Sequence, residues 1–306
     1  MKTKIGSLIL PGLLLMGVST AGHAQNTSGY NNKIPEGILT PDTVQTSIGT
    51  LKFFDGAPYP ETAQKVYDYL DTMRAVDTFL KGMPGASVDA LIKGNHELGA
   101  TQAHQVLIFD RLMDSNSLFL TGNTSTMYAV GFLDLLKDGP TVIDLPPGML
   151  GILDDMAFHY MTDLGVAGPD KGKGGKFLVL PPGYKGDVPK GYFVVPSKTS
   201  GVWVFMRGYL DKSLPLEKAI PAASANIRQN LKVYPLSRKD SQPKMEFINV
   251  SGMEMNTILP NDYSFFEKLH ALIQGEPDDY LGPEAKGMMA AIGIEKDKPF
   301  KPDARM

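Results

Sequence analysis

The sequence contains no cysteine among its 306 residues. This absence excludes disulfide bonds, thiol nucleophiles, cysteine-ligated zinc, iron–sulfur clusters and a lipid anchor on an N-terminal cysteine. The chain also lacks an excess of positive charge, because its formal net charge is −3. Without a basic field, a protein has no electrostatic means of condensing on nucleic acid or on an anionic membrane. We therefore expect no nucleic-acid partner.

Long apolar runs are absent too, although a membrane-spanning helix needs about 20 mostly apolar residues. The apolar run Ile5–Val18 is shorter, follows Lys2 and Lys4, and leads to small residues that end at Ala24. This order is typical of a secretory signal peptide cleaved after Ala24. We expect residues 1–24 to be removed, which changes the formal charge from −3 to −5. The remaining chain would be periplasmic or secreted, with no transmembrane segment.

The composition predicts a loop-rich globular protein, since 42% of the residues are apolar, 21% are charged, and 32 glycines and 23 prolines occur. The length allows one large domain or two ordinary ones. Behind the signal peptide we expect four regions. These are a flexible leader at residues 25–38, a helical region at 39–106, a β-sandwich domain at 107–255 and a C-terminal helical segment or linker at 256–306.

The strongest helical pattern begins at Pro60, after which apolar residues recur every three or four positions until Gly82. One face of this helix, including Val66, Met73 and Leu80, is expected to be buried. A second, shorter helix is predicted from Ser87. Further helices are predicted at Ser213–Leu231, from Asp262 and from Pro283.

Between the helical regions, short apolar runs alternate with glycine and proline clusters. This pattern favours many short antiparallel strands over βαβ units, so the predicted fold class is α+β with an antiparallel sandwich. The predicted strands are Ser117–Leu120, Met127–Leu135, Thr141–Leu145, Leu150–Met161, Phe177–Leu180, Gly191–Val195, Val202–Tyr209 and Met245–Val250.

Familiar catalytic and cofactor motifs are not complete in this chain. The pair His96-Glu97 begins like the H-E-x-x-H zinc motif, but Ala100 occupies the place of the second histidine, and His104 follows two helical turns away. The glycine- and lysine-rich segment 168–176 lacks the spacing and the final Ser or Thr of a phosphate-binding loop. There is no G-x-S-x-G elbow either. We therefore expect no metal site and no cofactor.

One predicted strand carries residues that could form a ligand wall. Trp203, Phe205 and Arg207 alternate along it, so their side chains lie on one face of the sheet. An aromatic surface beside a guanidinium group can bind an organic ligand. The competing interpretation is ordinary packing of the aromatic rings.

Several long blocks resemble one bacterial family. They are Gly122–Tyr128, Phe132–Leu135, Gly139–Val142 and Gly165–Val195. Together they are similar to the signature of the domain of unknown function 1254 family. The resemblance implies an exported protein with an immunoglobulin-like β-sandwich accompanied by helices. It attaches no secure biochemical activity.

The chain departs from the family pattern in two respects. The motif Asn-x-Asp-Thr-x-Tyr is represented by Asn123, Thr126 and Tyr128, but Ser125 stands at the Asp position. We therefore expect no chemistry that depends on a carboxylate at this position. Relatives usually continue into a 1214-type, jelly-roll-like domain, whereas this chain ends at Met306. We expect a member without that downstream domain.

Three functional hypotheses follow. The first is a periplasmic ligand-binding or envelope-associated protein, with a cleft for a small polar ligand between the helices and the sandwich. The residues expected to line this cleft are Asn123, Thr126, Tyr128, Trp203 and Arg207. The second hypothesis is a hydrolase or lyase acting on a small polar organic substrate. It would use Tyr128 and Arg207, with Asp134 or His159 as the acid–base group.

The third hypothesis is a structural subunit. Apolar residues of the C-terminal helices, including Phe265, Leu269 and Met289, present a large apolar surface. Either this surface docks on the sandwich, or it binds a partner. The partner would be a second copy of the chain or a separate 1214-type jelly-roll chain.

Overall fold

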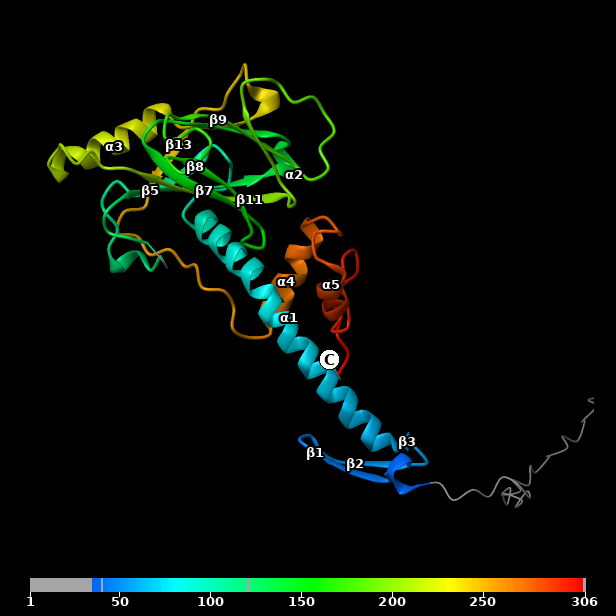
Figure 1. Ribbon diagram of the computed structural model, residues 1–306. Helices are drawn as coiled ribbons and strands as arrows, with labels where there is room; N and C mark the ends of the chain where they lie inside the picture. Colours follow the sequence, from blue (N-terminus) through cyan, green and yellow to red (C-terminus); the bar gives the residue numbers. More distant parts are fainter. Residues whose placement is uncertain (1–34, 40, 120–121, 305–306) are drawn as a thin grey trace, which may run out of the picture. The chain divides into compact units, whose positions relative to one another are not determined.

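A computed structural model describes residues 35–39, 41–119 and 122–304 (Figure 1). The predicted signal peptide, residues 1–24, and most of the predicted leader lie outside the described residues. The chain forms two compact units, Met1–Ala63 and Gln64–Met306. The first contains the 3-10 helix η1 (Glu36–Ile38) and an antiparallel sheet of β1 (Thr43–Thr46), β2 (Gly49–Phe54) and β3 (Ala57–Pro58). The sequence analysis did not predict this sheet.

Helix α1 (Pro60–Glu97) begins in the first unit and continues through the second. The prediction of two helices, one ending at Gly82 and one beginning at Ser87, is wrong. An added Cβ at Gly82 would lie 2.5 Å from Leu269 Cδ2, and one at Gly85 would lie 2.8 Å from Leu272 Cδ2. The glycines therefore admit a neighbouring helix, and this packing offsets the cost of about 1 kcal/mol that each glycine carries in a helix.

Only part of the predicted face of α1 is buried: Phe79 packs against Phe265, with 4.5 Å between ring centroids. Met73 is 47% exposed and Leu80 is 60% exposed, whereas Thr78 and Ala86 are buried. Where α1 packs against α4 it carries Gly82 and Gly85, which allow the two helices to approach closely. Apolar periodicity alone therefore did not identify most of the buried residues of α1.

Two C-terminal helices, α4 (Ser264–Gly275) and α5 (Pro283–Ala290), lie beside the middle of α1 (Figure 1). Phe265, Leu269, Met289 and Ile292 form one buried cluster with Ala86 of α1. The apolar surface of the C-terminal helices is therefore covered largely by α1 within the same chain.

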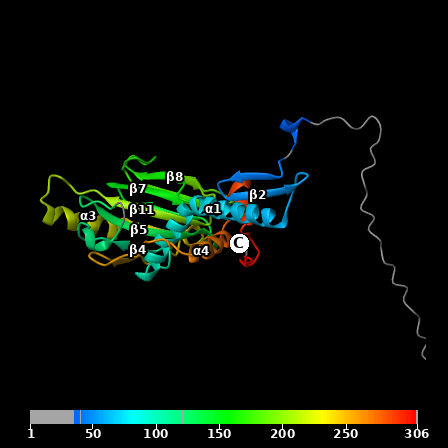
Figure 2. The same cartoon turned by 90° about the horizontal axis from the view of Figure 1, so that it is seen from below.

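Ten strands of the second unit form two sheets, and Figure 2 shows β8, β7, β11, β5 and β4 side by side. In spatial order, the six-stranded sheet contains β13 (Glu246–Asn249), β4 (Gln105–Ile108), β5 (Met127–Asp134), β11 (Gly201–Gly208), β7 (Met149–Asp155) and β8 (Tyr160–Gly165). The four-stranded sheet contains β10 (Phe193–Pro196), β9 (Gly175–Leu180), β6 (Thr141–Leu145) and β12 (Lys232–Pro235). The remaining helices of this unit are η2 (Ser115–Ser117), α2 (Leu135–Asp138), α3 (Leu216–Asn230) and η3 (Leu236–Arg238).

The two sheets share a hydrophobic core. Val204 and Met206 of β11 belong to the same buried cluster as Ile143 of β6 and Phe177 of β9. The α+β class is therefore confirmed, with largely antiparallel sheets in which only β9–β10 and β4–β13, among the described strands, pair in parallel. The immunoglobulin-like assignment stays a prediction.

The other face of the six-stranded sheet is covered by helix. Trp203 and Phe205 of β11 share a second buried cluster with Val88 and Ile92 of α1. The alternation of residues along β11 thus separates two cores, one within the sandwich and one beneath α1.

Two predicted strands are wrong in detail. Ser117 belongs to the 3-10 helix η2, and Leu120 lies outside the described residues. The run Leu150–Met161 contains a turn that separates β7 from β8. None of the helices within residues 35–39, 41–119 and 122–304 has the length and apolarity needed to cross a bilayer.

We expect Gly82→Val to destabilise the second unit, because the new side chain would displace Leu269 from α1. Overpacking of this kind costs about 1–3 kcal/mol, and the urea midpoint of unfolding should fall accordingly. Gly275→Val at the end of α4 is the matched control, since an added Cβ there meets nothing within 4 Å. Equal midpoints for the two variants would contradict the close packing of α4 on α1.

Candidate functional site

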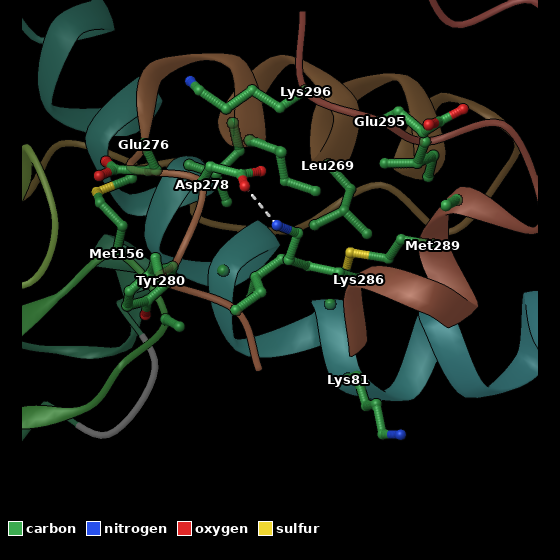
Figure 3. Close-up of a pocket in the computed structure, with 18 of the residues that line it drawn as sticks. Lys81, Met156, Leu269, Glu276, Asp278, Tyr280, Lys286, Met289, Glu295 and Lys296 are labelled. Carbon is green, nitrogen blue, oxygen red and sulfur yellow. Dashed lines mark hydrogen bonds and ion pairs between the residues drawn. The ribbon is translucent and has the colours of Figure 1, made fainter. Parts of the chain in front are cut away.

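The second unit contains a cavity of about 380 Å³ between α1, α4, α5 and the turn from β7 to β8 (Figure 3). Its wall is mostly apolar and includes Leu269, Leu272, Met289 and Met156. Gly82 and Gly85 of α1 also line it. A mostly apolar cavity of this size is within the range of pockets that bind small organic molecules.

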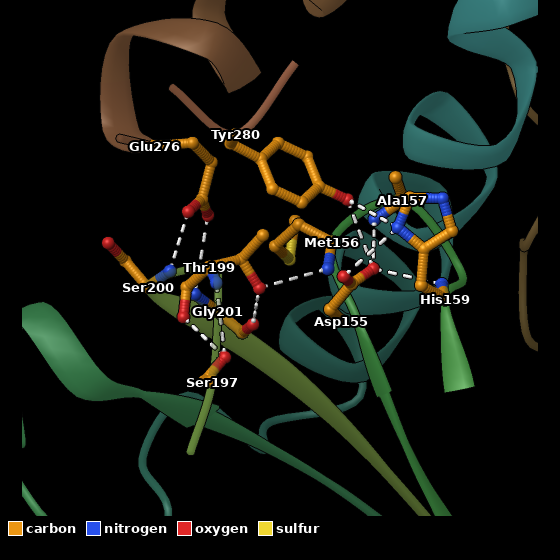
Figure 4. A network of polar contacts seen from close by, with 10 residues as sticks. All are labelled: Asp155, Met156, Ala157, His159, Ser197, Thr199, Ser200, Gly201, Glu276 and Tyr280. Carbon is orange, nitrogen blue, oxygen red and sulfur yellow. Dashed lines mark hydrogen bonds and ion pairs between the residues drawn. The ribbon is translucent and has the colours of Figure 1, made fainter. Parts of the chain in front are cut away.

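Glu276 lies at one end of the cavity, in the connection between α4 and α5. Its side chain is buried, and its two oxygens accept hydrogen bonds from Ser200 N at 2.5 Å and Gly201 N at 3.3 Å (Figure 4). These donors belong to the turn that leads into β11. Burial raises the pKa of Glu276 to about 7, and the nearby Asp155 carboxylate acts in the same direction. Glu276 can therefore change its charge near neutral pH.

Asp155 organises the turn between β7 and β8. Its Oδ1 accepts hydrogen bonds from Ala157 N and His159 N, both at 2.9 Å. Tyr280, from the connection after α4, donates its hydroxyl to the same oxygen at 3.1 Å, and His159 Nδ1 lies 3.2 Å from Asp155 Oδ2. One carboxylate thus joins the turn of the sandwich to the C-terminal segment (Figure 4).

Tyr280 is the second polar group at this end of the cavity. Burial, followed by the negative charge of Asp155, raises the pKa of Tyr280 above its usual value. The phenol therefore remains protonated and acts as a hydrogen-bond donor. Lys286 and Asp278 line the cavity as an ion pair with an N–O distance of 2.5 Å (Figure 3).

The residues of the family motif form hydrogen bonds with one another in the turn that leads into β5. Asn123 Oδ1 accepts hydrogen bonds from Ser125 N at 2.9 Å and Thr126 N at 3.0 Å. Asn123 N in turn donates to the hydroxyl of Tyr128 at 2.8 Å, and the Tyr128 side chain is buried. These contacts stabilise a turn, and none of the three predicted site residues lines the cavity.

Trp203 and Arg207 do share one face of β11, as predicted. Trp203 stacks on Phe205 with 4.9 Å between ring centroids, and Phe205 stacks on Tyr128 at 5.0 Å. The Arg207 guanidinium carbon lies 5.4 Å from the centroid of the Tyr128 ring. The structure thus connects Tyr128, Trp203 and Arg207 through Phe205, but none of these residues reaches the large cavity. Their ligand-binding role stays a prediction.

The residues of the enzyme hypothesis are dispersed. Asp134 accepts hydrogen bonds from Leu136 N and Lys137 N and so caps α2. Only His159 belongs to the polar network beside the cavity. No group of three or more His, Cys, Asp or Glu residues in the described ranges could hold a metal ion.

Sequence reasoning missed Asp155, Glu276 and Tyr280. The turn after Asp155 contains no glycine or proline, and Phe158 instead adopts a positive φ of 61°. The available signal was Asp155 itself, because aspartate side chains often accept hydrogen bonds from the backbone two residues further on. For Glu276, the sequence Gly275-Glu-Pro marks only the end of a helix.

The fold and the site define an α+β protein in which a β-sandwich carries a cavity enclosed by helices. Residues 104–235 match the family described as "Protein of unknown function (DUF1254)", which confirms the resemblance over this part of the chain. The match runs from β4 to β12 and includes the β7–β8 turn. Helices α1, α4 and α5 lie outside it.

A crystal structure of the VPA0106 protein from Vibrio parahaemolyticus has a similar fold, with a TM-score of 0.52 and 15% sequence identity. The similarity covers 75% of this chain and 53% of that one, so this chain spans about half the length of its structural neighbour. No curated protein matches the sequence. At this identity the likeness concerns the fold alone.

The raised pKa of Glu276 predicts a stability difference that depends on pH. Because the folded protein holds the proton more tightly, the free energy of unfolding falls as pH rises from about 4.5 to about 7. We expect Glu276→Gln to gain stability relative to the wild type over this range, by up to roughly 3 kcal/mol. Burial also raises the pKa of Asp154, to about 6. Because Asp154 is present in both proteins, its contribution cancels when the free energy of unfolding of the variant is compared with that of the wild type.

Urea unfolding at pH 5 and pH 8 tests this expectation. Glu217→Gln is the control, since Glu217 is an exposed carboxylate in the first turn of α3. If the free energies of unfolding of Glu276→Gln and of the wild type change in parallel as the pH rises, the pKa of Glu276 is not raised in the folded protein.

Proposed function

We propose that this chain is an exported binding protein for a small amphipathic organic molecule. The apolar part of the ligand would occupy the cavity between α1, α4 and α5, and its polar group would meet Glu276 and Tyr280. The observation that carries this proposal is the asymmetry of the cavity. Its wall is mostly apolar, but a buried carboxyl and a partly buried phenol lie together at one end.

The chemistry of the cavity suits such a ligand for two reasons. Each methylene group removed from water contributes about 0.8 kcal/mol, so the apolar wall supplies affinity. The Tyr280 hydroxyl donates its proton to Asp155, so its oxygen can accept a hydrogen bond from the ligand, and Glu276 accepts or donates according to its charge. Together they would orient the ligand's polar end.

Export is the second part of the proposal, and it rests on the sequence of residues 1–24. Their two lysines, apolar run and small residues before Ala24 support cleavage there and a periplasmic or secreted location. The absence of cysteine suits an oxidising compartment. An envelope-associated role would follow from the same location.

Calorimetric titration with 1-hexanol and 1-octanol tests ligand binding. We expect both alcohols to bind, with affinity rising about fourfold per added methylene. Gly287→Phe should abolish binding, because Gly287 lines the cavity and an added Cβ there meets nothing within 4 Å.

Gly282→Phe is the matched control for this experiment. Gly282 also has open space around an added Cβ, precedes α5 directly and does not line the cavity. Equal affinities of the two variants, or no binding of either alcohol by the wild type, would contradict the proposal.

A hydrolase or lyase is the second candidate function, and the titration of Glu276 favours it. A carboxyl whose pKa lies near 7 is suited to general acid–base catalysis at neutral pH. Hydrolysis of p-nitrophenyl octanoate would distinguish this function from binding alone. Turnover that Glu276→Gln abolishes while 1-octanol still binds would support the enzyme, and an unchanged background rate would reject it for esters.

A structural subunit has less support. Its partner, a second copy or a 1214-type jelly-roll chain, was expected to cover the C-terminal helices. Phe265, Leu269 and Met289 are already buried within this chain.

A further inference from the structure

A second, smaller pocket of about 180 Å³ lies on the face of the six-stranded sheet that points away from the sandwich core. Its lining residues are Leu150, Gly151, Ile152, Asp163, Phe205 and Arg207. It shares no lining residue with the large cavity. Ligand binding at this pocket would therefore be independent of the binding function proposed for the large cavity.

The strand register places a positive and a negative group on either side of an apolar floor. Arg207 of β11 pairs with Leu150 of β7, and Phe205 pairs with Ile152. Ile152 in turn pairs with Asp163 of β8. Arg207 and Asp163 thus stand two strands apart, roughly 10 Å at the usual strand spacing, with apolar side chains between them.

The guanidinium of Arg207 is held by aromatic rings rather than by an acid. Its central carbon lies 5.4 Å from the Tyr128 ring centroid and 5.5 Å from that of Phe205. Within the described part of the chain, none of its N–H groups has a hydrogen-bond or ion-pair partner. A guanidinium fixed through its face keeps its edge available for bidentate binding of a carboxylate.

Asp163 supplies the complementary charge. Its Oδ2 accepts a hydrogen bond from the Tyr160 hydroxyl at 3.1 Å, which fixes the side chain. Its Oδ1 has no donor among the residues that the structure describes. No ion pair joins Asp163 to Arg207 in the described ranges, so both groups can receive a ligand at the same time.

From this arrangement we propose that the pocket binds a small zwitterion, an α-amino acid, with its carboxylate on Arg207 and its ammonium group on Asp163. Leu150, Ile152 and Phe205 contact the amino-acid side chain. A simple anion would meet the repulsion of Asp163, and a simple cation would meet that of Arg207. The volume corresponds to about six waters at about 30 Å³ each, which suits a molecule the size of alanine or serine.

Calorimetric titration of the full chain with glycine, L-alanine, L-serine and L-valine tests this proposal. Propionate and ethylamine serve as probes because they resemble alanine without its ammonium group or its carboxylate. We expect at least one of the four amino acids to bind at least tenfold more tightly than either probe. Failure of all four amino acids to bind would overturn the proposal, and so would binding of propionate or ethylamine with equal affinity.

Variants assign the binding to this pocket. Arg207→Gln and Asp163→Asn should each weaken amino-acid binding at least tenfold. Arg238→Gln and Asp187→Asn, at exposed positions outside both pockets, should leave it unchanged. Equal affinity in all four variants would overturn the proposal.

A folding defect could imitate the loss of binding, and a third substitution separates the two. Arg207→Lys keeps the positive charge near the aromatic rings but removes the planar fork. We expect this variant to unfold at the wild-type temperature and still lose part of the affinity. Full wild-type affinity of Arg207→Lys would show that no bidentate contact is made.

Discussion

Two buried carboxylates, Glu276 and Asp155, join the C-terminal segment to the sandwich. Burying a carboxylate is unfavourable unless hydrogen-bond donors surround it. Backbone N–H groups of two turns supply these donors, Ser200 and Gly201 for Glu276, and residues 157 and 159 for Asp155. The connection between α4 and α5 is joined to these turns at two points, because Glu276 accepts from Ser200 and Gly201 and Tyr280 donates to Asp155.

The large cavity is a consequence of that placement. Glu276 and Tyr280 fix the segment that follows α4, while Gly82 and Gly85 let α4 approach α1 closely. Side chains from α4 and α5 enclose the space that remains. The polar end of the cavity therefore contains Glu276 and Tyr280, the same two residues that join the C-terminal segment to the sandwich.

The sandwich was predictable from local sequence, because alternation and glycine–proline punctuation act over a few residues. Strand β6 has the predicted bounds, β5 ends one residue earlier than predicted, and β11 is shifted by one residue at each end. The length of α1 was not predictable in the same way. The low helix propensity of glycine suggested an end at Gly82, whereas the helix continues there because α4 packs against it.

The candidate site was not predictable, because its contacts join distant parts of the chain. Tyr280 donates to a residue 125 positions earlier, and Glu276 accepts from residues 76 and 75 positions earlier. Such pairs leave no pattern in a single sequence. One part of the predicted ligand wall is present in the structure: Trp203 and Arg207 share a face of the sheet, and Arg207 lines the smaller pocket.

Methionine-methyl NMR during titration with 1-octanol tests the central claim, that the large cavity is a binding site, most directly. Met156 and Met289 line the cavity, whereas Met127 and Met149 are buried in the core of the sandwich. The account predicts that the alcohol shifts the Met156 and Met289 resonances and leaves the Met127 and Met149 resonances in place. Unchanged Met156 and Met289 resonances, or equal shifts at all four methionines, would contradict it.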